Sequence, residues 1–213
     1  MPKRVDHDRR REELAGALVR CARVHGLHAT GFREVAAEAG VSVNLVQYYF
    51  PTKQQLLHGG LLHLRARISR RLSHALAALP EPADPVAQVR AILVHLMPHD
   101  QDSADLYRVH AAYAALALTD PALAAQPHTA GPDELHPVLT DLVTRAGQQG
   151  RTDPRRDPRT TATTLLALAT GLSAYTTSGY HTAADAVRGL DDQLDLLFPP
   201  ADPSPVRRSA LRG

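Results

Sequence analysis

Residues 32–50, FREVAAEAGVSVNLVQYYF, decide the fold of the N-terminal part of this chain. A helix-turn-helix needs a small residue where its helices touch, a glycine at the reversal and apolar residues that hold the second helix. Ala36 is the small residue, Gly40 follows four positions later, and Val46 lies ten positions after Ala36. Ser42 is a natural N-cap for a second helix over about 43–49. The stretch therefore predicts a helix-turn-helix.

Polar side chains occupy the outer positions of the predicted second helix. Asn44, Gln47 and Tyr48 are not explained by burial. Asn and Gln can each bond an adenine edge through two hydrogen bonds, and Tyr can contact a thymine methyl group or a phosphate. The alternative interpretation is an ordinary solvated helix hairpin. The joint spacing, the basic residues upstream and Lys53 favour contact with the major groove of DNA.

Positive charge is concentrated in the first third of the chain. Residues 1–71 hold 13 Lys and Arg against 6 Asp and Glu, a net charge of +7, whereas residues 72–213 hold 11 against 16, a net charge of −5. The asymmetry indicates that the first third meets a polyanion, although chance alone is an alternative explanation. Sequence-independent contacts to DNA phosphates are expected from a basic arm formed by Lys3, Arg4, Arg9, Arg10 and Arg11.

Composition and proline positions predict an all-α protein. Aromatic residues make up only 4% of the chain and Trp is absent, which suits helices better than strands. The 16 prolines separate the helical patterns. Besides the helix-turn-helix, we expect helices over about 8–25, 51–80, 86–97, 104–118, 135–147 and 158–178 and around 187–197, with a short turn between 120 and 131. Residues 199–213 are expected to form a disordered tail.

Residues 30–56, TGFREVAAEAGVSVNLVQYYFPTKQQL, resemble the DNA-binding signature of TetR-family transcriptional regulators. The matching features are Thr30, the AGVS of residues 39–42, the aromatic pair of residues 49–50 and Lys53. More weakly, TDPALA at 119–124 and LLALATGL at 165–172 resemble a turn and a dimerisation segment of the family. The resemblance implies a three-helix DNA-binding domain (residues 1–52) and a larger helical ligand-binding and dimerisation domain (residues 53–198), with about nine helices.

The resemblance also implies which residues contact DNA. Lys53 is expected to bind a phosphate, since it begins a helix whose free amides and dipole favour an anion. The family often has Gly or Pro at the position of Asn44 and Tyr at that of Gln47, so this chain's operator sequence cannot be carried over. The implied DNA contacts are Arg33, Ser42, Val43, Asn44, Gln47, Tyr48, Tyr49 and Lys53.

A recognition helix of two turns reads only a few base pairs, which implies a symmetric dimer on a palindromic operator. Apolar stripes on the last two expected helices are candidates for a four-helix interface with a second copy. The alternative is that these stripes close the core of the monomer. The stripes consist of Leu165, Leu168, Leu172 and Tyr175, and of Val187, Leu190, Leu194 and Leu197.

A ligand pocket inside the fourth to seventh helices is implied by the same resemblance, and its occupation is expected to move the fourth helix, which begins at Lys53, and so to change the spacing of the two DNA-binding heads. Aromatic and polar residues recur at three-residue spacing on one expected helix, near two residues of the preceding helix. Alternatively, the tyrosines only pack in the core. The candidate ligand-binding residues are His95, Met97, Tyr107, His110 and Tyr113.

Other chemistry is not expected. His95 and His99 have a spacing that suits a metal, but Pro98 interrupts their helix and no further ligands complete a site. Cys21 lies on a packed helix face as a small core residue, and no catalytic motif is present. We therefore expect no enzyme activity, metal or cofactor. A single cysteine, a charged N-terminus and no apolar run of about 18 residues indicate a cytoplasmic protein without a membrane span.

These observations predict a ligand-responsive transcriptional regulator. The predicted protein is a repressor that binds double-stranded DNA as a homodimer and is released by a small-molecule effector, whose identity the sequence does not indicate. Two other classes stay open: a helical small-molecule-binding protein or enzyme with a vestigial DNA-binding head, and an architectural DNA-binding protein without a ligand.

Overall fold

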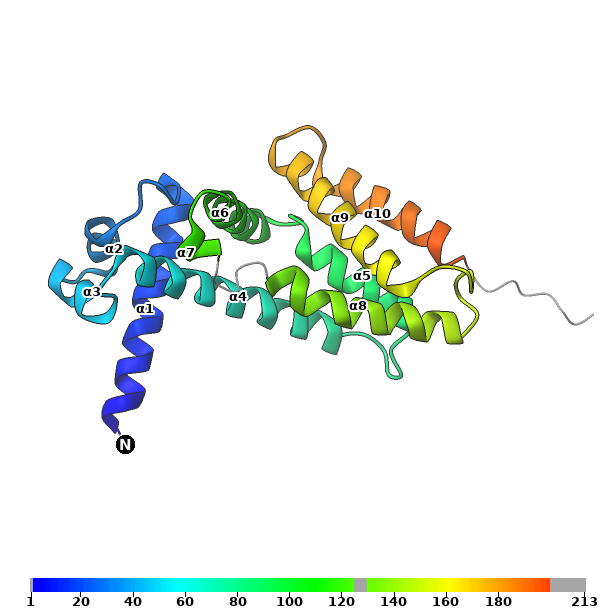
Figure 1. Ribbon diagram of the computed structural model, residues 1–213, viewed down its shortest axis with the longest axis horizontal. Coiled ribbons are helices and arrows are strands. Elements are labelled where there is room, and N and C mark those ends of the chain that lie inside the picture. The colour runs from blue at the N-terminus through cyan, green and yellow to red at the C-terminus, as the bar shows by residue number, and fades with distance from the viewer. Residues whose placement is uncertain (1, 125–129, 200–213) are drawn as a thin grey trace, which may run out of the picture.

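The computed structural model describes residues 2–124 and 130–199. This part of the chain is entirely helical, which confirms the all-α prediction (Figure 1). Nine of its helices have two turns or more, and α7 has one. The helices are α1 (Pro2–His25), α2 (Phe32–Ala39), α3 (Val43–Tyr49), α4 (Lys53–Ala77), α5 (Pro85–Leu96), α6 (Gln101–Ala117), α7 (Pro121–Ala124), α8 (Ala130–Gln148), α9 (Pro158–Thr177) and α10 (Ala183–Leu197).

Four helices, α1, α6, α8 and α10, begin three residues or more before the expected position. Helix α1 starts at Pro2 rather than near residue 8, because its first turns are polar and give no apolar periodicity. Exposed ion pairs one turn apart, Arg9 with Asp6 at 2.6 Å and Arg10 with Glu13 at 2.7 Å, accompany these turns. Helix α6 starts at Gln101 rather than at 104, where the Asp100 carboxylate accepts a hydrogen bond of 2.6 Å from the Ser103 amide. Helix α8 starts at Ala130 rather than near 135.

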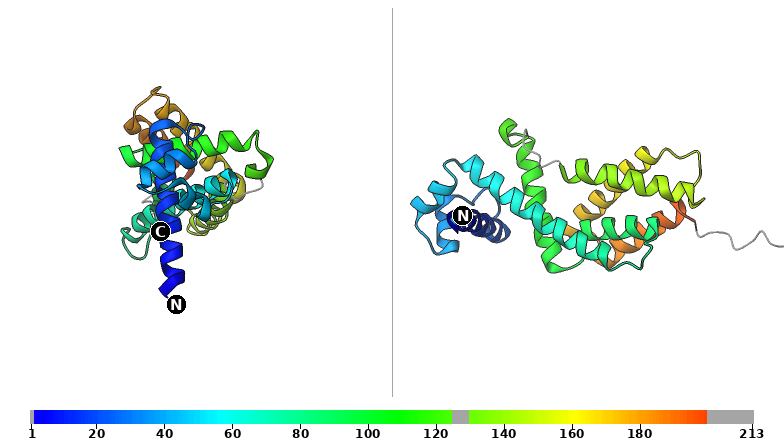
Figure 2. Two further views of the ribbon diagram at one scale, coloured as in Figure 1. Left: turned by 90° about the vertical axis from the view of Figure 1, so that its left-hand side faces the viewer. Right: turned by 90° about the horizontal axis from the view of Figure 1, so that it is seen from below.

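Two hydrophobic cores lie at opposite ends of an elongated molecule, and α4 runs between them (Figure 1). The first core joins α1, α2, α3, the N-terminal half of α4, α6 and α7. The second core joins α5, α8, α9 and α10, with Leu72 and Leu76 of α4 packed against it. Helix α6 crosses α4 between the two ends (Figure 2). The helix-turn-helix sequence therefore ends at the expected domain boundary, residue 52. The first hydrophobic core nevertheless includes residues on both sides of this boundary.

Two glycines let α4 approach its neighbours closely. A Cβ atom added at Gly60 would lie 2.3 Å from Cδ2 of Leu18 on α1 and 2.6 Å from the hydroxyl of Tyr113 on α6. A Cβ atom added at Gly59 would lie 2.5 Å from the buried ring of Phe50. The Tyr113 hydroxyl donates a hydrogen bond of 2.8 Å to the Leu57 carbonyl. These contacts hold α1, α4 and α6 together at one crossing.

A histidine lies on the same face of α4, against α1. A Cβ atom added at Gly16 would be 3.3 Å from the His63 ring, and His63 Nδ1 lies 3.9 Å from the Glu12 carboxylate. Burial is the main cause that lowers the pKa of His63, and the charges of Arg67, Arg70 and Arg20 lower it further, while Glu12 raises it. The imidazole is therefore neutral in the folded protein.

In the part of the chain that the structure describes, no helix is long and apolar enough to cross a membrane. The expected tail at 199–213 lies outside the described residues, apart from the exposed Pro199.

The close approach at Gly60 predicts that Gly60→Ala destabilises the protein. Overpacking costs about 1–3 kcal/mol, which exceeds the gain of about 1 kcal/mol in helix propensity. Gly147→Ala is the matched control, since its Cβ would only be in ordinary contact, 3.6 Å from Thr152 Cγ2. Chemical denaturation of both variants measures the difference. A Gly60→Ala variant as stable as the wild type would contradict the packing described here.

The lowered pKa of His63 predicts a loss of stability in acid. The folded pKa lies below the unfolded value of about 6.5, so the unfolded state binds more protons as the pH falls. The stabilisation is complete above the unfolded pKa and is lost as the pH falls below it. The free energy of unfolding of His63→Gln should therefore decline less between pH 7.5 and 5 than that of the wild type. His74→Gln, at an exposed position on the same helix, should follow the wild type.

Candidate functional site

The turn of the helix-turn-helix depends on Gly40. Its φ of 64° is left-handed, and its amide donates to the carbonyls of Ala36 and Ala37 to end α2. The Val41 amide donates to the Ala36 carbonyl at 3.0 Å. Ala36 and Val46 are buried in the first core, as the spacing predicts. The reversal therefore places α3 firmly against α2.

Helices α3 and α4 both begin at capping hydroxyls. Ser42 Oγ accepts a hydrogen bond of 3.2 Å from the Leu45 amide, and Thr52 Oγ1 accepts one of 3.1 Å from the Gln55 amide. The Ser42 hydroxyl is thus engaged in capping within the protein. Lys53 is exposed in the first turn of α4, where the positive end of the helix dipole favours a phosphate.

The outer face of α3 carries the predicted polar residues. Asn44, Gln47 and Tyr48 are exposed, with Tyr48 at 69%, and Arg33 of α2 is exposed as well. Two other predicted DNA contacts, Val43 and Tyr49, are half-buried and pack against the first core, because they lie three residues on either side of the buried Val46. Val43 and Tyr49 therefore mainly hold α3 in place.

The basic arm is part of α1 and lies beside α3. The His7 ring is 4.6 Å from the Tyr49 ring and 6.3 Å from the Tyr48 ring, measured between centroids. Arg9 and Arg10 are exposed in their ion pairs, whereas the Arg11 guanidinium lies 5.1 Å from the centre of the Phe50 ring. The side chains of Lys3 and Arg4 lie outside the described residues.

Part of the positive charge assigned to the first third of the chain belongs to the second half of α4. Residues 1–53 alone hold 9 Lys and Arg against 6 Asp and Glu, a net charge of +3. Three arginines of α4 pair with acidic groups of later helices: Arg65 with Glu134, Arg67 with Asp102, and Arg71 with both Asp100 and Asp102. These three arginines are therefore paired within the protein, so the net charge of +7 overstates the positive charge that the first third of the chain can present to a polyanion.

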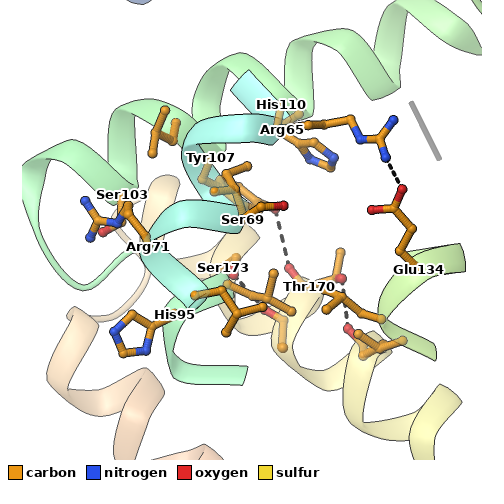
Figure 3. A pocket seen from close by; sticks show the side chains of 18 of the residues that line it. Arg65, Ser69, Arg71, His95, Ser103, Tyr107, His110, Glu134, Thr170 and Ser173 are labelled. Atoms are coloured by element: carbon orange, nitrogen blue, oxygen red, sulfur yellow. Dashed lines mark hydrogen bonds and ion pairs between the residues drawn. The ribbon is translucent and has the colours of Figure 1, made fainter. Parts of the chain in front are cut away.

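A cavity of about 320 Å³ opens between α4, α5, α6, α8 and α9 (Figure 3). Three of the five candidate ligand-binding residues, His95, Tyr107 and His110, line it. The Tyr107 hydroxyl is 3.4 Å from the Thr170 carbonyl of α9, and burial raises the pKa of this phenol. His95 Nδ1 lies 2.9 Å from the Ala91 carbonyl.

Two predicted ligand-binding residues lie elsewhere. Met97 is buried in the second core, because it caps α5 where the chain turns inward. Tyr113 is buried in the first core, and its hydroxyl is bonded to the Leu57 carbonyl. Burial raises the pKa of Tyr113 far above its ordinary value. The three-residue spacing on α6 drifts around the helix, so of the three candidates on this helix only Tyr107 and His110 line the cavity.

Helix α4 was expected to take part in this cavity, but none of its lining residues was among the candidate ligand-binding residues. Arg65, Ser69 and Leu72 line it and recur at four- and three-residue steps on one face of α4. Near the other end of the lining, Arg71 Nη1 is 2.6 Å from Asp102 and Arg71 Nη2 is 2.8 Å from Asp100. The Ser103 amide and Arg71 hold the pKa of Asp100 well below its usual range, so this carboxylate is ionised at neutral pH.

The predicted dimer stripes are only partly on the surface. Leu165, Leu190 and Leu194 are fully or almost fully buried in the second core, so the assignment of these three to an interface is wrong. Tyr175 is 56% exposed, and its ring centroid is 5.3 Å from that of Tyr180. The others are half-buried against the same core: Leu168, Leu172, Val187 and Leu197.

The other candidate reactive groups take structural positions. Cys21 is buried, its thiol lies 3.4 Å from the Glu34 carbonyl, and burial raises its pKa. The rings of His95 and His99 lie 5.1 Å apart. Within residues 2–124 and 130–199, no group of three His, Cys, Asp or Glu side chains is arranged to hold a metal ion.

Two family models match the chain. Residues 15–59 match the model described as bacterial regulatory proteins, tetR family. Residues 85–199 match the model described as BetI-type transcriptional repressor, C-terminal. The chain is 30% identical to the HTH-type transcriptional regulator BetI of Burkholderia cenocepacia over 93% of this chain and 98% of the relative. It is 25% identical to the HTH-type transcriptional regulator PksA of Bacillus subtilis over 93% of this chain and 90% of that relative.

Solved structures share the fold. A transcriptional regulator from Rhodococcus sp. Rha1 has a TM-score of 0.75 and 28% identity, over 88% of this chain and 95% of its own. A putative transcriptional regulator from Saccharomonospora viridis, crystallised in complex with choline, has a TM-score of 0.77 and 20% identity, over 88% of this chain and 96% of its own.

Proposed function

The chain belongs to the TetR family of bacterial transcriptional regulators, and on this premise we propose that it is a ligand-released repressor that binds a palindromic operator as a homodimer. It is a DNA-binding regulator and not an enzyme. The single observation that carries the proposal is the exposed polar face of α3, with Asn44, Gln47 and Tyr48 beside Lys53. The matching C-terminal family model is described as a transcriptional repressor, which supports repression rather than activation. Action on DNA would place the protein in the cytoplasm.

We propose that α3 enters the major groove. Asn44 and Gln47 lie one turn apart on the same face and can bond the edges of neighbouring base pairs. Arg33 of α2 and Lys53 of α4 are exposed on the two neighbouring helices and suit phosphates. The exposed arginines of α1 add a contribution that does not depend on sequence and weakens with salt.

The proposed dimer uses the outward face of α9 with α10. Small residues Ala167, Gly171 and Ala174 recur at four- and three-residue steps on this exposed face, and Leu196 of α10 is exposed. Small side chains allow the helices of two copies to approach closely. The half-buried Leu168, Leu172, Val187 and Leu197 would complete the apolar contact.

The proposed effector site is the cavity beside α4. One neighbour of this fold was crystallised in complex with choline, a small molecule. Because α4 both lines the cavity and begins at Lys53, a change in its position would alter the spacing of the two recognition helices in a dimer.

The α3 assignment predicts two different losses of DNA binding. With DNA selected by the purified protein from a random library, Gln47→Ala should cost about 1–3 kcal/mol of binding and relax specificity at one position. Lys53→Ala should weaken binding to all sequences alike. It should also reduce the slope of the logarithm of the binding constant against the logarithm of salt concentration by about 1. Arg155→Ala is the control, because Arg155 is exposed and paired only within the α8–α9 connection. Unchanged binding of both α3–α4 variants would refute the assignment.

The proposed interface predicts that Ala174→Glu produces monomers. In a dimer, the new carboxylate would lose its hydration against the partner without a compensating charge. Thr144→Glu, at an exposed position on α8, should leave the dimer intact. Light scattering after gel filtration distinguishes the two states. A dimeric Ala174→Glu variant would place the interface elsewhere, and a monomeric wild type would refute the proposed homodimer.

A further inference from the structure

We propose that His7 of α1 is a positioning residue for DNA recognition, and that its ring fixes the direction of the Tyr48 ring on α3. The proposal rests on the proposed function, in which the outer face of α3 enters the major groove. Figure 1 shows that the first turns of α1 project from the rest of the molecule, and the side chains from Asp6 to Glu13 are exposed. The buried part of α1 begins at Leu14, so these turns act through contacts at the surface.

Three aromatic rings form one cluster where α1 passes α3. The His7 ring lies 4.6 Å from the Tyr49 ring, tilted by 43°, and 6.3 Å from the Tyr48 ring, edge-on at 71°, between centroids. The two tyrosine rings lie 5.2 Å apart at 87° to each other. Tilted and edge-to-face pairs at about 4.5–7 Å are the arrangements that aromatic rings favour. The Tyr48 ring is therefore held by contacts with two other rings.

This cluster is attached to the first core at its inner side. Tyr49 is half-buried against that core, and the next residue, Phe50, is fully buried in it. Arg11 lies one turn after His7 on α1, and its guanidinium is 5.1 Å from the centre of the Phe50 ring. One face of α1 thus follows the aromatic residues at the end of α3, and His7 is placed by contacts on both of its neighbours in this row.

Tyr48 is the member of the cluster that can reach DNA. Its side chain is 69% exposed and lies four residues after Asn44, on the outer face of α3. In the described part of the chain, the rings beside it are those of His7 and Tyr49. A side chain that must be ordered during binding lowers the affinity, whereas one that is already oriented does not. Contact with His7 therefore prepares Tyr48 for a base edge.

The surroundings of His7 distinguish its role from that of the nearby arginines. His7 Nδ1 lies 3.8 Å from the exposed carboxylate of Asp8, and a carboxylate at this distance disfavours a phosphate beside the imidazole. Arg9 and Arg10 carry exposed guanidinium groups on the same turns, and these suit phosphates. His7 should consequently affect the choice of sequence, and the arginines should affect binding to all sequences.

The test compares variants of the full chain on DNA that the wild type selects from a random library, at several salt concentrations. His7→Ala should bind the selected DNA about threefold to tenfold more weakly, which corresponds to the loss of aromatic contacts. It should also relax the base preference at the position that Tyr48→Ala relaxes, while the salt dependence stays as in the wild type. Ala is a better helix former than His, so this loss cannot come from unwinding of α1.

Three further variants separate the ring from the charge. His7→Phe should keep the affinity and the base preference, because it keeps a ring. Arg9→Ala is the matched control: it should weaken binding to all sequences, reduce the salt dependence and leave the base preference unchanged. Because His7 acts through Tyr48, adding His7→Ala to Tyr48→Ala should cause no further loss. A further loss as large as that in the wild-type background would refute this route.

Two other results would overturn the proposal. One is a His7→Ala variant with the affinity and base preference of the wild type. The other is a variant that loses affinity for all sequences alike and has a weaker salt dependence, which would make His7 a phosphate contact.

The outcome is separable from that of the proposed function. A wild type that selects no sequence would refute the proposed function, whereas selection that His7→Ala leaves unaltered would refute only the role of His7. The ring contact is also measurable without DNA. In the nuclear Overhauser spectrum of the free protein, we expect cross-peaks between the ring protons of His7 and Tyr48, and their absence would contradict the proposed positioning whether or not DNA is bound.

Discussion

Helix α4 packs into both hydrophobic cores, and the relation between the two ends of the molecule depends on this shared helix. Gly59 and Gly60 let Phe50, α1 and α6 pack against its N-terminal half, and the Tyr113 hydroxyl fixes α6 to the Leu57 carbonyl. Its 25 residues span about 37 Å without a proline. In the proposed mechanism, a displacement of this continuous helix at the cavity would be carried to Lys53.

The basic residues at the two ends of α4 also differ in whether they are paired with acidic residues. Lys53 is exposed at its beginning, whereas Arg67 and Arg71 are tied to Asp102 and Asp100 near the cavity. The pKa of Asp100 lies well below its usual range, so its carboxylate stays ionised far into the acidic range. The cavity end of α4 is therefore anchored to the start of α6 by a network, and it is also connected to α8, where Arg65 pairs with Glu134.

Local rules predicted the helix-turn-helix well, and they failed where burial depends on distant partners. The turn at Gly40 and the cap at Ser42 involve neighbours within a few residues, so their chemistry is readable from the sequence. Periodicity correctly indicated that Leu190 lies on an apolar face, but it does not say whether that face meets the same chain or another copy. It likewise could not separate Tyr107, which lines the cavity, from Tyr113, which is buried in the first core. The ion pairs between arginines and acidic residues of different helices could not be predicted either, because Asp102 is distant in sequence from Arg67.

Helix α9 connects the cavity with the proposed dimer contact. Its inner face contributes Ala169, Thr170 and Ser173 to the cavity wall, and its outer face carries the exposed Gly171 and Ala174. A helix is about 10 Å across, so a ligand would lie one helix diameter from the partner chain in the proposed dimer. The packing of α9 into the second core is dense, with Leu165 fully buried, and dense packing resists small displacements. In the proposed mechanism, ligand binding would therefore shift α4 against a fixed α9 rather than open the proposed dimer.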